Sequence, residues 1–260
     1  MFRINVAKDR FELGERAAAH VAHILRHVIA EKGEARIVLS TGASQFDTLE
    51  ALTKRTDIRW ECVEMFHLDE YVGLPISHPA SFRKYLQERF VDKLPALKAV
   101  HFVDGTKENI EELTRELRRA PIDLGLIGIG ENTHIAFNDP PADFDTDEAY
   151  IIVRLNDTCK RQQVREGWFA TEDDVPKEAV SMTVKQIMKC QRIVSIVPRA
   201  VKADAVAATL SQDKNNMVPA TIMKSHPDFT LFVDADSFAK VDEAAIRPAP
   251  EMPDYTIERK

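Results

Sequence analysis

The sequence predicts a single-domain α/β protein with an open, mostly parallel, twisted sheet and helices on both faces. Along most of the 260 residues, apolar runs of strand length alternate with longer amphipathic segments. Parallel strands need connections of helix length between them, so this alternation favours a parallel sheet. No repeat, low-complexity segment or Gly/Ser linker divides the chain. We therefore expect residues 1–260 to form one domain.

The first part of the chain shows the pattern clearly. Residues 2–7 (FRINVA) predict a strand, and residues 11–32 carry apolar side chains at helical spacing before Gly33, which favours a helix C-cap. Residues 35–40 (ARIVLS) form a β-branched, almost uninterrupted apolar run, as a strand buried on both faces should. A helix is expected to follow over residues 45–55.

The later elements repeat this order. Residues 61–68 (ECVEMFHL) predict a strand, and residues 78–94 predict a helix with Pro79 near its start. Residues 141–180 are the least regular and most acidic part of the chain, and we expect them to form an excursion that covers part of the functional site. The further strands are expected at residues 100–105, 122–130, 191–198 and 228–235, and the further helices at residues 108–120 and 199–210.

Composition excludes several classes of protein. The net charge of −7 and the absence of a Lys/Arg run disfavour nucleic-acid binding. Cys62, Cys159 and Cys190 lie far apart with no CxxC spacing, which favours a reducing compartment and argues against a structural zinc. No signal pattern or apolar run of about 18 residues is present, so we expect a cytoplasmic protein with no membrane partner.

Three expected strands end in turns that could carry chemistry. Ligands of open parallel sheets bind beyond the carboxyl ends of the strands. The first such turn, LSTGAS, places small residues before a helix, where backbone N–H groups bind anions. The alternative for this turn is a simple N-cap at Ser44. The LSTGAS sequence matches neither GxGxxG nor GxxxxGK[ST], which disfavours a dinucleotide or a nucleoside triphosphate as the ligand.

The other two turns carry ionisable side chains. HLDEYVG places Asp69 and Glu70 at a strand end, where a carboxylate can act as a general base or simply belong to an exposed acidic loop. GENTHIAFND contains His134, with Asn132 and Asp139 close in sequence. A histidine hydrogen-bonded to a carboxylate has a fixed tautomer and one nitrogen free for proton transfer. We interpret this third turn as a proton-transfer site.

These motifs, in this order, resemble the glucosamine-6-phosphate deaminase (isomerase) family and, more broadly, the 6-phosphogluconolactonase relatives that share its Rossmann-like fold. The resemblance is carried by STGAS, LDEYVGLP with HPASF, and GIGENTHIAFNDP, and it runs from about residue 35 to 235. It implies conversion of glucosamine 6-phosphate into fructose 6-phosphate and ammonia, with no metal or organic cofactor. HIAFN favours the deaminase branch.

The resemblance also assigns roles. It implies that Asp69 moves the proton between C2 and C1, that His134 assists opening of the sugar ring, and that Asp139 stands where the family has a Glu that orients the histidine. It further implies that Lys202 reaches the phosphate. The residues that match the phosphate loop are Thr41, Gly42, Ala43 and Ser44.

The sequence departs from the family at several of these positions. Asn132 stands where an Asp is usual and Thr133 where a Gly is common, so we expect His134 to be less readily protonated than in relatives. In the loop, Ala43 replaces a Gly and Gln45 a Pro. The family's phosphate-binding arginine would fall near Val164, which leaves Arg161 and Arg165 as candidates.

Alternative functions remain open from the sequence. Asn132 and Thr133 motivate a related lactonase or isomerase acting on another sugar phosphate. A non-catalytic sugar-phosphate sensor is a third reading, although the first expected strand leaves no room for an N-terminal DNA-binding domain. Residues 142–152 lack the basic pair of the family's allosteric site, so we expect no activation by N-acetylglucosamine 6-phosphate. The sequence does not fix the oligomeric state, and a homo-oligomer stays open.

Overall fold

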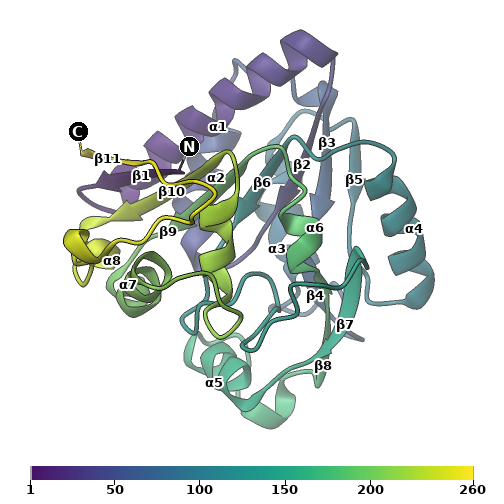
Figure 1. Cartoon of the computed structure of the whole chain (residues 1–260). Helices are drawn as coiled ribbons and strands as arrows, with labels where there is room; N and C mark the ends of the chain where they lie inside the picture. The colour runs from purple at the N-terminus through teal and green to yellow at the C-terminus, as the bar shows by residue number, and fades with distance from the viewer. Residues whose placement is uncertain (1, 260) are drawn as a thin grey trace.

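A computed structural model describes residues 2–259 of the chain. The elements follow one another as the sequence predicts over most of the chain (Figure 1). The strands are β1 (Phe2–Ala7), β2 (Ala35–Leu39), β3 (Val63–His67), β4 (Asp69–Tyr71), β5 (Ala99–His101), β6 (Leu124–Ile127), β7 (Tyr150–Arg154), β8 (Glu178–Met182), β9 (Ile193–Val197), β10 (Phe229–Asp234) and β11 (Tyr255–Arg259). The α-helices are α1 (Arg10–Lys32), α2 (Phe46–Thr53), α3 (Phe82–Arg89), α4 (Lys107–Arg118), α5 (Asp157–Arg165), α6 (Val184–Ile187), α7 (Ala203–Ser211) and α8 (Ala235–Phe238).

Eight strands form one sheet in the order β11-β1-β10-β9-β6-β2-β3-β5, and every neighbouring pair is parallel. The central strands are buried from end to end, as the uninterrupted apolar runs predict. The predicted fold class, an open parallel sheet within an α/β domain, is therefore confirmed. After β2 the chain builds outward to β3 and β5, and then returns to β6 on the other side of β2. The strand order thus reverses between β2 and β6.

Helices cover both faces of this sheet. One apolar core contains side chains of α1, α2 and α3, and the other contains side chains of α4, α6, α7 and α8. In Figure 1, α1 crosses one side of the sheet while α4 and α6 lie on the other. Within residues 2–259, no helix combines the length and the apolar character needed to cross a membrane.

A second sheet of three antiparallel strands, β4-β8-β7, was not predicted. The expected strand over residues 61–68 ends at His67, and after Leu68 the chain enters β4. Leu68 is bonded to both sheets, since its N–H donates to Leu39 O and its carbonyl accepts from Met182 N. Figure 1 shows β7, β8 and α5 together at the bottom of the view. The segment 141–180 therefore contains regular structure that its composition did not indicate.

Helix starts differ from the predictions where capping decides them. Ser81 caps α3 by accepting from Lys84 N, so the helix begins after Ser81 and not near Pro79. Gly33 does cap α1, with a left-handed φ of 81°. The alternative that Ser44 caps the helix after β2 is wrong, because the N-cap of α2 is Gln45 and makes no side-chain capping bond.

Candidate active site

A cavity opens at the carboxyl ends of the adjacent strands β9, β6, β2 and β3. Its lining includes residues 40–45 after β2, Asp69 after β3, His134 in the turn after β6, and Lys202 after β9. The reversal of strand order between β2 and β6 leaves the two following loops diverging, which creates such a crevice. Side chains of α5 from the 141–180 segment form part of the wall.

The turn after β2 presents small residues and backbone to the cavity. Thr41, Gly42, Ala43 and Ser44 all line it. Gly42 has a φ of 100°, which favours glycine, and its carbonyl accepts from Gln45 N and from Tyr85 Oη at 3.0 Å each. These bonds hold the turn in a shape that suits an anion.

Two cationic side chains line the same cavity as this turn. Lys202 is 8% exposed, and no hydrogen bond or ion pair within residues 2–259 engages its ammonium. Burial lowers the pKa of Lys202. Arg199 also lines the cavity, and sequence reasoning missed it. Its φ of 82° lies in the left-handed region, and its N–H donates to both oxygens of Asp234 at 3.0 and 2.9 Å. The signal available was its place directly after the strand at residues 191–198.

The two carboxylates of HLDEYVG have different surroundings. Glu70 is fully buried and accepts from Tyr71 N, Ser81 Oγ, Phe82 N and the Arg83 N and Nε groups, at 2.8–3.2 Å. It thereby caps the first turn of α3. Asp69 is 6% exposed, lines the cavity and receives no hydrogen bond to its carboxyl group from the described residues. Burial, with a smaller contribution from Glu70, raises the pKa of Asp69 from 3.8 to about 8.

His134 lies in a network of amides and carboxylates. Its Nδ1 is 2.5 Å from Asn132 Oδ1 and 3.2 Å from Asp139 Oδ1. Asn132 Nδ2 donates to Asp139 Oδ1 at 2.9 Å, which fixes the amide orientation because a carboxylate only accepts. Two acceptors at Nδ1 place the proton there and leave Nε2 as the basic nitrogen. The shorter Asp139 therefore reaches the ring.

Asp139 has a further partner and stays ionised. Asn156, the N-cap of α5, donates from Nδ2 to Asp139 Oδ2 at 3.0 Å. Burial alone would raise the pKa of Asp139, but the hydrogen bonds from His134 and Asn132 lower it below its ordinary value. The sequence did not single out Asn156, since residues 141–180 carried no predicted helix to cap.

The turn after β6 is strained at Thr133, where the resemblance leads us to expect Gly. The φ of Thr133 is 70°. Its Oγ1 donates to Asn132 O at 2.5 Å, and Ala220 N donates to Thr133 O at 3.0 Å. Asn138 holds the end of the turn, with Nδ2 donating to Met182 O at 2.8 Å. The polar residues of this turn therefore form two sets: those hydrogen-bonded around His134, and those that hold the backbone of the turn.

The arginines expected near Val164 do not both reach the cavity. Arg165 lines it and forms an ion pair with Glu131. Arg161 is exposed, lies outside the cavity lining and donates to Thr158 Oγ1. Among residues 2–259, the cationic side chains of the cavity lining that no hydrogen bond or ion pair engages are thus Lys202 and Arg199, which follow β9.

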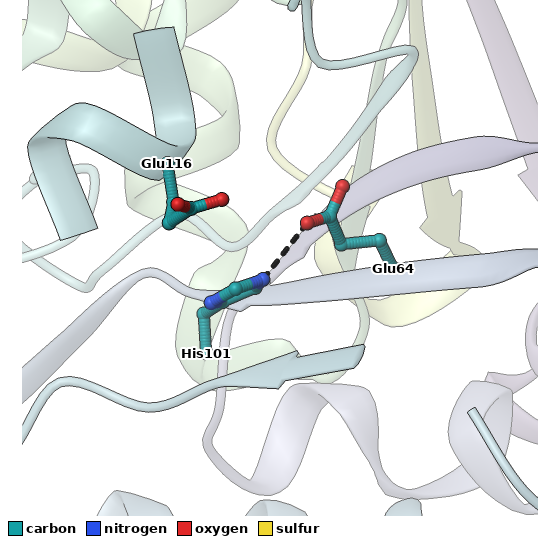
Figure 2. Close-up of side chains that lie close together, drawn as sticks. All are labelled: Glu64, His101 and Glu116. Atoms are coloured by element: carbon teal, nitrogen blue, oxygen red, sulfur yellow. Dashed lines mark hydrogen bonds and ion pairs between the residues drawn. The ribbon is translucent and has the colours of Figure 1, made fainter. Parts of the chain in front are cut away.

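Within residues 2–259, one further group of side chains could attract a cation, and Figure 2 shows it between β3, β5 and α4. The ligand atoms of Glu64, His101 and Glu116 lie within 4.8 Å of one another. However, Arg36 Nε lies 2.6 Å from Glu64 Oε2, and Arg119 Nη2 lies 2.7 Å from Glu64 Oε1. His101 Nε2 also bonds Glu64 Oε1 at 2.8 Å. Two guanidinium groups already neutralise this carboxylate, so we interpret the group as an ion-pair network and not as a metal centre.

The sequence matches known proteins over most of its length. The family model described as glucosamine-6-phosphate isomerases/6-phosphogluconolactonase matches residues 8–231. Glucosamine-6-phosphate deaminase of Staphylococcus epidermidis is 34% identical over 231 residues, covering 85% of this chain and 93% of the relative. The deaminase of Thermoanaerobacter pseudethanolicus is 30% identical over 242 residues, covering 90% of this chain and 94% of the relative.

Solved structures share the fold. A monomeric glucosamine-6-phosphate deaminase has a TM-score of 0.83 at 25% identity, covering 92% of this chain and 100% of that one. A 6-phosphogluconolactonase from Thermotoga maritima has a TM-score of 0.73 at 16% identity, covering 89% of this chain and 99% of that one. At this identity the similarity is one of fold alone.

Fold and relatives together define an α/β enzyme, and its candidate site is the cavity at the reversal of an open parallel sheet. More particularly, the chain belongs to the glucosamine-6-phosphate isomerase/6-phosphogluconolactonase family.

Proposed function

We propose that this enzyme converts glucosamine 6-phosphate and water into fructose 6-phosphate and ammonia, within cytoplasmic amino-sugar breakdown. The observation that carries the proposal is the convergence in one cavity of three parts. These are a buried carboxyl group that receives no hydrogen bond from the described residues (Asp69), a histidine of fixed tautomer (His134), and a small-residue turn that shares the cavity with the side chains of Lys202 and Arg199. Each part serves one stage of the reaction.

The phosphate would lie against the turn of residues 41–44. Backbone N–H groups of this turn and the ammonium of Lys202 supply donors and positive charge. Arg199 adds a second cation, in the place of the family arginine that Arg161 does not supply. Binding at this end leaves the sugar chain extending toward Asp69 and His134.

Ring opening would use His134. A closed pyranose has no acidic proton at C2 until the bond between C1 and the ring oxygen breaks. His134 Nε2, the basic nitrogen of the ring, can take a proton from the C1 hydroxyl and return one to the ring oxygen. Asp139, ionised behind the ring, stabilises the imidazolium that forms in between.

Isomerisation would use Asp69. Its carboxylate removes the proton from C2 of the open aldose and delivers it to C1, while a proton of the substrate's own ammonium group passes to the C1 oxygen. The C1 carbonyl thereby becomes a hydroxyl and the double bond moves to C2–N. Water then adds to the resulting iminium, and ammonia leaves as the ketone forms. The products are fructose 6-phosphate and one ammonia for each water consumed. We propose that α5 and the rest of residues 141–180 cover this site during the reaction.

The direct test is turnover of glucosamine 6-phosphate by the purified protein, with ammonia and fructose 6-phosphate measured together. We expect both in a 1:1 ratio. The competing activity is hydrolysis of 6-phosphogluconolactone, which needs no base for a carbon-bound proton. Lactone hydrolysis without ammonia release would replace the proposed reaction with the lactonase one.

The pH dependence should follow Asp69. Since its pKa is raised to about 8, the carboxyl is mostly protonated at neutral pH and becomes a base only as the pH rises. We therefore expect kcat/KM for glucosamine 6-phosphate to increase from about pH 6 and to level off above about pH 8. The affinity for glucose 6-phosphate, measured at each pH in the same buffers, corrects kcat/KM for ionisation of the substrate's phosphate group. A kcat/KM already maximal at the acid end would contradict this role.

Arg199→Gln should weaken phosphate binding. Losing one charge-assisted hydrogen bond costs about 1.5–3 kcal/mol, so we expect KM to rise about 10–100-fold with a smaller change in kcat. Arg161→Gln is the matched control and should leave both constants within about twofold. Inhibition by inorganic phosphate, measured on both variants, checks the assignment. Equal constants for the two variants would remove Arg199 from the site.

A further inference from the structure

Gln163 on α5 has a side-chain amide that the protein itself does not satisfy. The residue is 7% exposed and lines the cavity. Its Oε1 is buried without a hydrogen-bond partner, and no bond within residues 2–259 engages its Nε2. The neighbouring Gln162 differs, because its Nε2 donates to Glu166 Oε1 at 2.8 Å. Of these two glutamines, Gln163 is the one left available to a ligand.

The position of Gln163 on α5 directs it toward the catalytic residues. Asn156, Cys159 and Gln163 are spaced i, i+3 and i+7, so they share one face of the helix. At the start of this face, Asn156 donates to Asp139 Oδ2 at 3.0 Å. At the C-terminal end of α5, Arg165 pairs with Glu131 of the turn that carries His134. Both ends of α5 are thus bonded to the catalytic turn, with Gln163 between them.

An unsatisfied amide at such a position is unfavourable without a ligand. A buried polar group left without a partner costs about 1–3 kcal/mol, whereas a leucine of similar size would have no such cost. Such groups are rare in folded proteins and call for a specific explanation. Since this one lines the cavity, a ligand that satisfies it is the explanation that fits its place.

The chemistry of the amide identifies the kind of ligand group. A planar amide offers a donor and an acceptor side by side. A phosphate would use only the donor, and an ammonium only the acceptor. Hydroxyl groups both donate and accept, so adjacent hydroxyls of a sugar chain satisfy both amide atoms. We propose that Gln163 is a specificity-determining residue that binds hydroxyl groups of the substrate; this rests on the proposed sugar-phosphate reaction.

The test compares Gln163→Leu with the wild type, using glucose 6-phosphate and inorganic phosphate as ligands and thermal unfolding as the readout. We expect the variant to bind glucose 6-phosphate about 10-fold more weakly, while its binding of phosphate is unchanged. The Tm of the free variant should equal or exceed that of the wild type, because an unsatisfied amide has been removed. KM for glucosamine 6-phosphate should also rise about 10-fold.

A matched control replaces another buried glutamine. Gln186 is 8% exposed, lies on α6 and is outside the cavity lining. Gln186→Leu should leave the affinity for glucose 6-phosphate unchanged. If Gln163 had a purely structural role, Gln163→Leu would instead lower the Tm of the free protein and weaken the binding of glucose 6-phosphate and of phosphate alike. That result would overturn the proposal.

Two other outcomes separate this proposal from the proposed reaction. Wild-type protein that binds glucose 6-phosphate no better than phosphate would also overturn the role of Gln163. Wild-type protein that binds glucose 6-phosphate more tightly than phosphate but releases no ammonia would refute the deaminase activity. If Gln163→Leu then loses this difference in affinity, the result would still support recognition of hydroxyl groups by Gln163.

Discussion

Replacing Asp69 by Asn is expected to lower kcat/KM for glucosamine 6-phosphate by about 10²–10⁴-fold, the usual contribution of a positioned general base. The amide keeps the size of the side chain but cannot accept the C2 proton. Binding of glucose 6-phosphate should change little, because the groups proposed to bind the phosphate are Lys202, Arg199 and the turn of residues 41–44, which line the cavity. Rates under saturating substrate, together with this affinity, separate loss of chemistry from loss of binding.

The same substitution should stabilise the protein. The pKa of Asp69 is raised from 3.8 to about 8, so the folded state retains a proton that the unfolded chain has released between these two values. The free energy of unfolding therefore falls as pH rises through this window. Asn removes this penalty, and we expect Tm to rise by about 2–4 °C or more, with a larger gain at pH 8 than at pH 5.

Asp236→Asn is the control for this experiment, since Asp236 is exposed on α8 and outside the cavity lining. It should alter neither rate nor Tm appreciably. An Asp69→Asn enzyme with the wild-type rate would exclude Asp69 as the base. A fall in Tm would show that the carboxylate stabilises the fold and would contradict its raised pKa.

The sequence allowed the main sheet to be predicted because its central strands are short, mostly apolar runs that alternate with longer amphipathic segments. Residues 35–39 and 193–197 are buried throughout. An apolar run of this length predicts a buried strand even when the neighbouring strands are not known. The small sheet was not predictable in this way. β7 is half exposed and lies in an acidic segment, and β4 has three residues that become a strand only by pairing with β8.

The residues of the candidate site likewise fall into those that could be predicted from the sequence and those that could not. His134, Asp69 and the turn of residues 41–44 follow predicted strands, so the rule of strand ends brought them together in advance. Gln163 lies on a helix in a segment with no predicted structure, and its importance depends on burial and on a missing partner. The raised pKa of Asp69 likewise depends on packing and on the orientation of Glu70, which the order of residues along the chain does not contain.

Gly130→Ala is the second substitution expected to have a large effect, and it acts through position and not through charge. A Cβ built at residue 130 would overlap the imidazole of His134 at Cε1, Nδ1 and Nε2. The backbone cannot easily yield, because Gly130 N donates to His134 O at 2.9 Å and Thr133 N donates to Gly130 O at 3.0 Å. The ring would have to leave its place beside Asn132 and Asp139.

We expect Gly130→Ala to lower kcat/KM by about 10²-fold, the order of loss that follows a misplacement of about 1 Å at a catalytic group. Gly128→Ala is the matched control two residues earlier, since its Cβ would meet Gln45 Nε2 at 3.5 Å and Ser40 Oγ at 3.8 Å, which is ordinary contact. It should cost less than about tenfold. The tautomer and hydrogen bonds of His134, followed by NMR of the ring nitrogens, distinguish a displaced ring from a general loss of folding. Equal activities in the two variants, with the ring signals of Gly130→Ala showing a displaced imidazole, would mean that ring opening does not depend on His134 beside Asn132 and Asp139, and that role would then have to pass to another group.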